Sequence, residues 1–345
     1  MVFRKSIWLF AIGIMLILLP LIISNPYHQH ILIMAGINGI LALGFVMLLA
    51  TGLVTLGAAT FWAIGAYSST LLMTRAGMSF WISLPLAGII CGVIAVPIGI
   101  LTVRLSKVAF VLVTIIVNAI VVLIFGRIEF FGGWGGLVAI PGPNPVLLPL
   151  NMKVEFNSKA PYYYLMIFLL SVTILVFYAL YKSRIGRAWK AIQLNPQLAQ
   201  TIGIDPYRFA LLAFIIVATF AGLAGSFYAH YVHTIEPETF SFWKSIYVQV
   251  YGIVGGVDYY ILGPLIGSLV MTFLPEFFRI TKEMEPIFTG AILLTLVIFL
   301  PGGLLSLFQR FVGFTDRMGQ GRIFLALLKK RNVKKGEITH GNSPN

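Results

Sequence analysis

The stretch KSRIGRAWKAIQLNPQLAQTIGIDPYR, residues 182–208, decides how the rest of the chain is interpreted. It carries five cations and one anion between two long apolar runs, so it does not belong in lipid. Ser183 is a predicted N-cap. Ile185, Trp189 and Ile192 then follow at helical spacing. The first part therefore predicts a basic helix with one narrow apolar stripe.

The second part of this stretch contains two further start signals. In Asn195-Pro196, Asn can cap a helix and Pro fits its first position. Gly203 can end that short helix in the left-handed conformation. Asp205-Pro206 then repeats the start signal. The whole stretch predicts a rigid helix-break-helix that lies along a membrane surface, held by the spans on either side.

The composition is that of a helical membrane protein. The chain has 345 residues, of which 59% are hydrophobic and only 10% are charged. A membrane crossing needs about 20 helical residues. Apolar runs that approach this length lie at residues 7–24, 31–50, 52–74, 80–103, 108–126, 162–181, 209–232, 243–254, 263–278 and 287–307. We expect an all-α, polytopic fold with about ten spans, arranged as two inverted five-helix halves.

The distribution of cations predicts the orientation. With the N-terminus inside, seventeen of the 24 Lys and Arg residues fall in cytoplasmic segments. Both termini and residues 182–208 are then cytoplasmic, and a Gly- and Pro-rich loop, 127–161, is an irregular cap on the outer face. The run after Arg4 and Lys5 has no cleavage site, so we expect an uncleaved first span. Residues 1–308 form the transmembrane domain, and residues 309–345 form a basic cytoplasmic tail.

Residues 51–69, TGLVTLGAATFWAIGAYSS, allow two interpretations. Their small residues are typical of close helix packing. Alternatively, they form a broken helix that exposes backbone groups, Thr51, Thr55 and Thr60 to a pathway. The turn near Thr51 is too short for an ordinary loop, which favours the second interpretation.

Few polar residues lie inside the predicted spans. Those expected to line a substrate pathway are Asn38, Thr55, Asn118 and Gln249. No acidic residue lies in the middle of a span, which argues against proton or sodium coupling and favours an external energy source. The chain has no phosphate-binding G-x-x-x-x-G-K-[ST] motif, so any ATP must be bound by another chain. We expect no catalytic site. His230 and His233 allow a metal site, but interfacial histidines are the favoured interpretation.

Several segments resemble one known family. They are GINGILALGF (36–45), TGLVTLGAATFWAIGAYSSTLL (51–72), SRIGRAWKAIQLNPQLAQTIGI (183–204), RFALLAFIIVATFAGLAGSFYAHY (208–231), GIVGGVDYYILGPLIGS (252–268) and LLTLVIFLPGGLLSLF (293–308). Over nearly its whole length the chain resembles the LivM-type permease subunits of branched-chain amino acid ABC importers. It departs from the family pattern at Leu53, Ala58, TIIVNAI (114–120) and GGVDY (255–259).

The resemblance implies a set of partners and a role for residues 182–208. The partners would be a second homologous permease, two cytoplasmic ATPase subunits that bind the ATP, and a periplasmic substrate-binding protein, all at the inner membrane of a bacterium or archaeon. No cofactor and no nucleic acid are implied for the chain itself. The segment 182–208 would dock into an ATPase. The residues that match the family pattern there are Arg184, Gly186, Arg187, Ala191, Ile192, Asn195, Ala199, Gly203 and Ile204.

Two other classes of protein remain as alternatives. A stand-alone secondary carrier or channel for a small solute such as urea or an amide would respond to an ion gradient and not to ATP. A membrane-embedded enzyme would need clustered His, Asp or Cys at membrane depth. The sequence shows no such cluster.

Overall fold

The computed structural model describes residues 25–148, 152–277, 290, 294–295 and 302–306. The predicted first span, most of the predicted last span and the tail 309–345 lie outside these residues. The prediction of ten spans in two inverted halves therefore stays a prediction.

The described part is helical apart from one small hairpin. The helices are α2 (Pro26–Leu49), α3 (Ala58–Thr74), α4 (Phe80–Thr102), α5 (Lys107–Arg127), α6 (Lys159–Lys182), α7 (Arg184–Leu194), α8 (Pro196–Thr201), α9 (Pro206–Val232), α10 (Phe242–Gly255) and α11 (Leu262–Phe277). Short 3-10 turns are η1 (Glu129–Phe131), η2 (Gly133–Gly135) and η3 (Pro237–Phe240).

Five of the described helices are long and apolar enough to cross a membrane, namely α2, α4, α5, α6 and α9. The predicted run 52–74 is helical only in its second part: α3 has 17 residues and follows a non-helical segment. Helices α10 and α11, with 14 and 16 residues, cover the predicted runs 243–254 and 263–278 almost completely but are short for a membrane crossing. The chain is therefore a multi-pass membrane protein in which the apolar run 52–74 is only partly helical.

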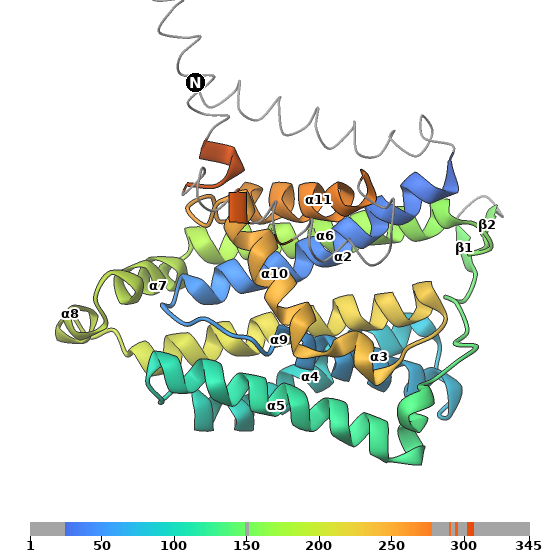
Figure 1. The fold of residues 1–345 in the computed structure, drawn as a ribbon, viewed down its shortest axis with the longest axis horizontal. Coiled ribbons are helices and arrows are strands. Elements are labelled where there is room, and N and C mark those ends of the chain that lie inside the picture. The colour runs from blue at the N-terminus through green and yellow to red at the C-terminus, as the bar shows by residue number, and fades with distance from the viewer. Residues whose placement is uncertain (1–24, 149–151, 278–289, 291–293, 296–301, 307–345) are drawn as a thin grey trace, which may run out of the picture.

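Helix α9 lies at the centre of the bundle and packs against α3 and α4 (Figure 1). The contact with α3 depends on glycine, because a Cβ on Gly225 would overlap the Trp62 carbonyl oxygen, and a Cβ on Gly65 would overlap the Gly222 carbonyl. Cys91 on α4 is buried against this contact and donates to the Phe61 carbonyl at 3.3 Å. Small residues thus let three helix backbones approach closely, as is usual in membrane bundles.

The loop 127–161 is irregular as predicted, but it contains two strands that the all-α prediction missed. Strands β1 (Val146–Leu148) and β2 (Met152–Val154) pair antiparallel, with Val146 opposite Val154. The Pro and Asn between these apolar runs prevent a helix and favour a reversal of the chain. Elsewhere the loop is tied to the segment after α9 by a bridge between Leu137 and Ile235.

The hairpin and the segment α7–α8 lie at opposite ends of the bundle (Figure 1). The end of α4 contacts the start of α9, the helix on which α7 packs: the Tyr207 hydroxyl donates to the Ile100 carbonyl at 3.5 Å, and the Arg104 guanidinium lies 4.5 Å from the Tyr207 ring centre. Arg104, which is distant along the chain, therefore lies at the same end of the bundle as Arg208.

Candidate functional site

The segment 182–208 has the predicted form, which its own side chains hold in place. The Ser183 hydroxyl accepts from the Ile185 amide at 3.1 Å and caps α7. The Asn195 side chain accepts from the amides of Gln197 and Leu198 at 3.0 and 3.1 Å and caps α8.

The end of α8 and the start of α9 also follow the predicted signals. Gly203 has a φ of +83°, the left-handed conformation expected at a helix end. The Asp205 carboxylate accepts from the amides of Tyr207 and Arg208 at 3.0 and 3.4 Å. The sequence therefore predicts every helix start in this segment correctly.

The apolar stripe of α7 faces the bundle. Trp189 and Ile192 are buried, and Ile185 is half-buried. The Trp189 indole also donates to the Phe209 carbonyl at 2.9 Å, which ties α7 to α9. The apolar stripe and this hydrogen bond therefore fix α7 against the start of the central helix.

The corner between α6 and α7 requires glycine. A Cβ on Gly186 would overlap the Tyr181 carbonyl oxygen and press against that of Leu180. Both obstacles are backbone atoms, which cannot rotate out of the way. The corner is therefore a close backbone packing that holds α7 at one angle to α6.

The nine predicted coupling residues differ in their exposure to solvent. Four are exposed, namely Arg184, Arg187, Asn195 and Gly203. Three are buried against the protein itself, namely Gly186, Ile192 and Ala199, while Ala191 and Ile204 are half-buried. The exposed group is available to a partner, whereas the buried group positions the segment.

Three exposed apolar side chains complete the outer face of the segment. Leu194, Leu198 and Ile202 are 80%, 65% and 70% exposed. Ala199 between them is buried, but a helix of six residues is too short for the sequence to show which side is covered. Apolar side chains exposed beside cations on a protruding element are typical of a protein interaction site.

The second candidate site is the break between α2 and α3, residues 50–57. Backbone amide and carbonyl groups in the break, and at the start of α3, bind side chains from other helices. The Leu56 amide donates to the Thr114 hydroxyl at 3.2 Å, and the Ala59 amide donates to the Ser245 hydroxyl at 3.0 Å. The Gln249 side chain donates to the Thr55 carbonyl at 2.8 Å. The chain is therefore broken before α3, as one interpretation of residues 51–69 expects, while the close packing of Gly65 against Gly222 agrees with the other.

We call Thr55, Thr114, Asn118, Ser245 and Gln249 the central polar cluster. Asn118 joins it from α5, one turn after Thr114, and donates to the Phe240 carbonyl at 3.1 Å. Its side-chain oxygen is buried and has no hydrogen-bond partner among the described residues. Of the four predicted pathway residues, Thr55 and Gln249 thus contact each other, while Asn118 lies one turn from Thr114 and binds η3.

The fourth predicted pathway residue, Asn38, lies apart from this cluster. It donates to the Thr272 hydroxyl at 3.1 Å, between α2 and α11. Its side-chain oxygen also has no partner in the described part of the chain. Spacing along the sequence could not show that Asn38 faces a different pair of helices.

The predicted exposure of Thr51, Thr55 and Thr60 to a pathway is not observed. Their exposed fractions are 4%, 4% and 1%. The space beside Thr55, Thr60 and Thr114 is about 10 Å³, near the smallest that holds one water molecule. The described helices are packed closed here because the side chains of α5 and α10 fill the break.

The two histidines near the end of α9 hold the loop 127–161. His230 is fully buried, with Nδ1 2.7 Å from the Pro141 carbonyl and Nε2 2.9 Å from the Ser69 hydroxyl. Nδ1 of His233 lies 2.8 Å from the Ile140 carbonyl. Among the described residues, no group of three or more His, Cys, Asp or Glu is placed to hold a metal ion. Both histidines serve here as hydrogen-bonding partners of the loop backbone.

The fold defines a multi-pass helical membrane protein with a basic, capped element at one end and a closed polar cluster inside. Residues 28–300 match the family model described as the branched-chain amino acid transport system / permease component. The chain belongs to this family of transport permeases, which confirms the LivM-type resemblance.

Two curated relatives are similar over most of the chain. Each is a high-affinity branched-chain amino acid transport system permease protein LivM, one from Salmonella typhimurium and one from Escherichia coli. Each is 28% identical over 323 residues, which cover 88% of this chain and 76% of the relative. No solved structure gives a significant match to the chain.

Proposed function

We propose that this chain is the permease subunit of an ATP-binding-cassette importer for branched-chain or similar small amino acids. The observation that carries the proposal is the segment 182–208, which combines a rigid capped backbone with exposed Arg184 and Arg187 and exposed Leu194, Leu198 and Ile202. The family supports a transport role. The substrate class follows the printed names of the relatives.

In this proposal the segment transmits movement of an ATPase subunit to the bundle. The ATPase binds its exposed face and moves as ATP is bound and hydrolysed. The tight corner at Gly186 passes the movement to α6, and the Trp189 hydrogen bond passes it to α9. A flexible loop would absorb such a displacement, whereas a capped and packed helix pair transmits it.

The central polar cluster is the proposed substrate-contacting region. It offers the amide groups of Asn118 and Gln249 and the backbone of Thr55 at a helix break, the kind of polar backbone that lines transport sites. Movement of α9 would carry the closely packed α3 with it, separate the break from α5 and α10, and open the cluster to a small zwitterion. Asn38, which contacts α11, would line the same pathway further along.

The remaining proposed components follow from this role. A second homologous permease completes the pathway, two cytoplasmic ATPases bind ATP in place of any cofactor of this chain, and a substrate-binding protein docks on the outer end near loop 127–161. The protein lies in the cytoplasmic membrane of a bacterium or archaeon, with both termini and the tail 309–345 inside. The chain itself performs no chemistry.

The test is copurification from native membranes. We expect an ATPase and a second permease to accompany the wild-type chain, and the ATPase to be lost from an Arg184→Glu/Arg187→Glu variant. The control is Arg127→Glu/Lys159→Glu, which makes the same charge change at the opposite end and should retain the ATPase. If both variants retain the ATPase, the docking assignment is wrong. Uptake that survives ATP depletion and follows a proton or sodium gradient would instead favour a stand-alone carrier.

A further inference from the structure

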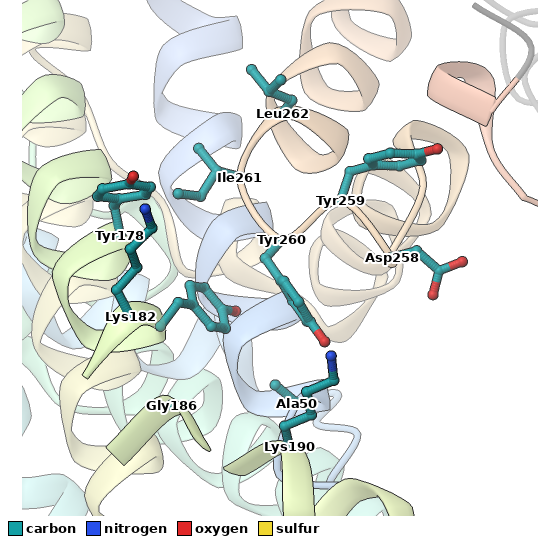
Figure 2. Close-up of a pocket in the computed structure, with 11 residues that line it drawn as sticks. Ala50, Tyr178, Lys182, Gly186, Lys190, Asp258, Tyr259, Tyr260, Ile261 and Leu262 are labelled. Carbon is teal, nitrogen blue, oxygen red and sulfur yellow. The ribbon is translucent and has the colours of Figure 1, made fainter. Parts of the chain in front are cut away.

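A pocket of about 440 Å³ lies beside the corner between α6 and α7 (Figure 2). One wall is formed by the end of α6 and the start of α7, with Tyr181, Lys182 and Lys190. The other wall is the turn between α10 and α11, with Tyr260 and Ile261. The pocket therefore lies at the basic end of the bundle, where the spans leave the membrane.

The interior of the pocket is positively charged. The Lys182 ammonium lies 4.7 Å from the Tyr178 ring centre, and the Lys190 ammonium points toward the hydroxyl end of Tyr260 (Figure 2). In the described part of the chain the ion pair found is Arg208 with Asp205, so neither lysine is paired with a described carboxylate. Asp258 lies on the opposite rim, and its carboxylate turns away from both lysines (Figure 2).

A buried donor also lines the pocket. The Tyr181 hydroxyl is buried and has no hydrogen-bond partner among the described residues. Its ring stacks on that of Tyr260 with the centres 4.7 Å apart, which fixes its direction. Buried hydroxyls are nearly always hydrogen-bonded, so this one indicates a missing acceptor.

We propose that this pocket binds the phosphate headgroup of an anionic phospholipid. Lys182 and Lys190 supply the positive charge, and the Tyr181 hydroxyl donates to a phosphate oxygen. Basic pockets between helices at the cytoplasmic membrane surface suit such headgroups. Ile261 and Leu262 provide apolar surface for the start of the acyl chains, which free phosphate would not need.

An occupied pocket would connect two parts of the protein. The lipid phosphate would bridge the α6–α7 corner, next to Gly186, and the turn between α10 and α11. It would therefore stabilise the position of α7 relative to the second half of the chain. The proposal does not depend on the transport function, since it concerns binding alone.

The experiment measures lipids retained by the full chain, with whatever copurifies with it. The protein is purified from membranes that contain phosphatidylglycerol and phosphatidylcholine, and bound lipids are counted by native mass spectrometry. We expect phosphatidylglycerol to be retained by the wild type, and retention to fall about fivefold for each lysine removed in Lys182→Gln and Lys190→Gln. Tyr181→Phe should weaken retention less and leave the fold intact.

The control removes two cations at the same end but outside the pocket, Arg104→Gln/Lys107→Gln. Equal retention in the wild type and the Lys182→Gln/Lys190→Gln variant would overturn the proposal, as would an equal loss in the control. The third arm adds inorganic phosphate at millimolar concentration. Displacement of the lipid by phosphate would identify a site for soluble phosphate and overturn the assignment to lipid. Retention despite phosphate supports it.

Discussion

The coupling segment 182–208 and the break 50–57 both interrupt apolar helices, but different interactions hold them. In the coupling segment, Ser183, Asn195 and Asp205 cap the helices that follow them, so each cap and its amides are two or three residues apart. In the break, the Thr55 hydroxyl accepts from the Gly57 amide at 3.0 Å, but further partners of the backbone come from α5 and α10, far along the chain. The first feature depends mainly on local capping, and the second mainly on tertiary contacts.

Because of this difference, we expect residues 182–208 to stay rigid and the break 50–57 to change shape when the helices move. A locally capped segment keeps its shape when neighbouring helices shift, as an element that transmits force must. A break held by distant side chains changes whenever those helices move apart. The transport cycle proposed above needs one element of each kind.

The largest expected effect is at the corner of the coupling segment. Gly186→Val would place side-chain atoms on the Tyr181 carbonyl and force α7 away from α6. We expect loss of ATPase binding and of uptake, with a destabilisation of about 1–3 kcal/mol, the usual range for overpacking. Copurification and thermal unfolding of the purified chain measure the two effects.

Gly77→Ala, between α3 and α4, is the matched control for this change. Gly77 has a φ of +64°, and among the described residues no atom other than those of its chain neighbours lies within 4 Å of the site of its Cβ. The substitution should cost only the strain of a left-handed residue, about 1 kcal/mol, and leave ATPase binding in place. If both variants lose the ATPase equally, close packing at Gly186 is not the cause.

The next effect is expected in the central polar cluster. Asn118→Leu and Gln249→Leu remove amides that bind the Phe240 and Thr55 carbonyls. We expect uptake to fall about tenfold with each, roughly the value of one hydrogen bond, while ATPase copurification stays unchanged. Asn38→Leu is the comparison outside the cluster. Uptake rates at wild-type level in the Asn118 and Gln249 variants would contradict the pathway assignment.

A smaller effect is expected from the exposed apolar face of the coupling segment. Leu198→Gln/Ile202→Gln changes side chains that are 65% and 70% exposed, so folding stability should change by about 0.5 kcal/mol or less. Binding to the ATPase should weaken several-fold because apolar contact area is lost. Titration of the purified ATPase onto the reconstituted permease measures this. An unchanged affinity would show that Leu198 and Ile202 are not part of the interface with the ATPase.

The smallest expected effect is a shift of helix boundaries in isolated peptides. Two peptides in detergent micelles, residues 182–208 and residues 50–74, compare the locally capped segment with the break. The first should keep helix starts at Arg184 and Pro196, because its caps lie within the peptide. The second should extend its helix before Ala58, because Thr114 and Ser245 are missing. Backbone chemical shifts by NMR give the boundaries. A break at residue 57 in the isolated peptide would show that it too is local.

The sequence by itself determined the class of protein, the apolar runs, the caps of the coupling segment and the left-handed Gly203. These features depend on composition or on residues within one or two helical turns, which is the range over which helix caps and periodicity act. It also placed Asn118 and Gln249 among the few polar residues of the spans, without showing which groups they bind.

Only the tertiary structure decided which polar residues meet and which face the outside. Gln249 of α10 binds the Thr55 carbonyl in the break and Asn118 of α5 binds the Phe240 carbonyl of η3, whereas Asn38 faces α11. Neither the hairpin in loop 127–161 nor the exposure of Ile202 could be read from short segments. The physical reason is that these features depend on contacts between residues far apart along the chain, and on which side of a helix its neighbours cover.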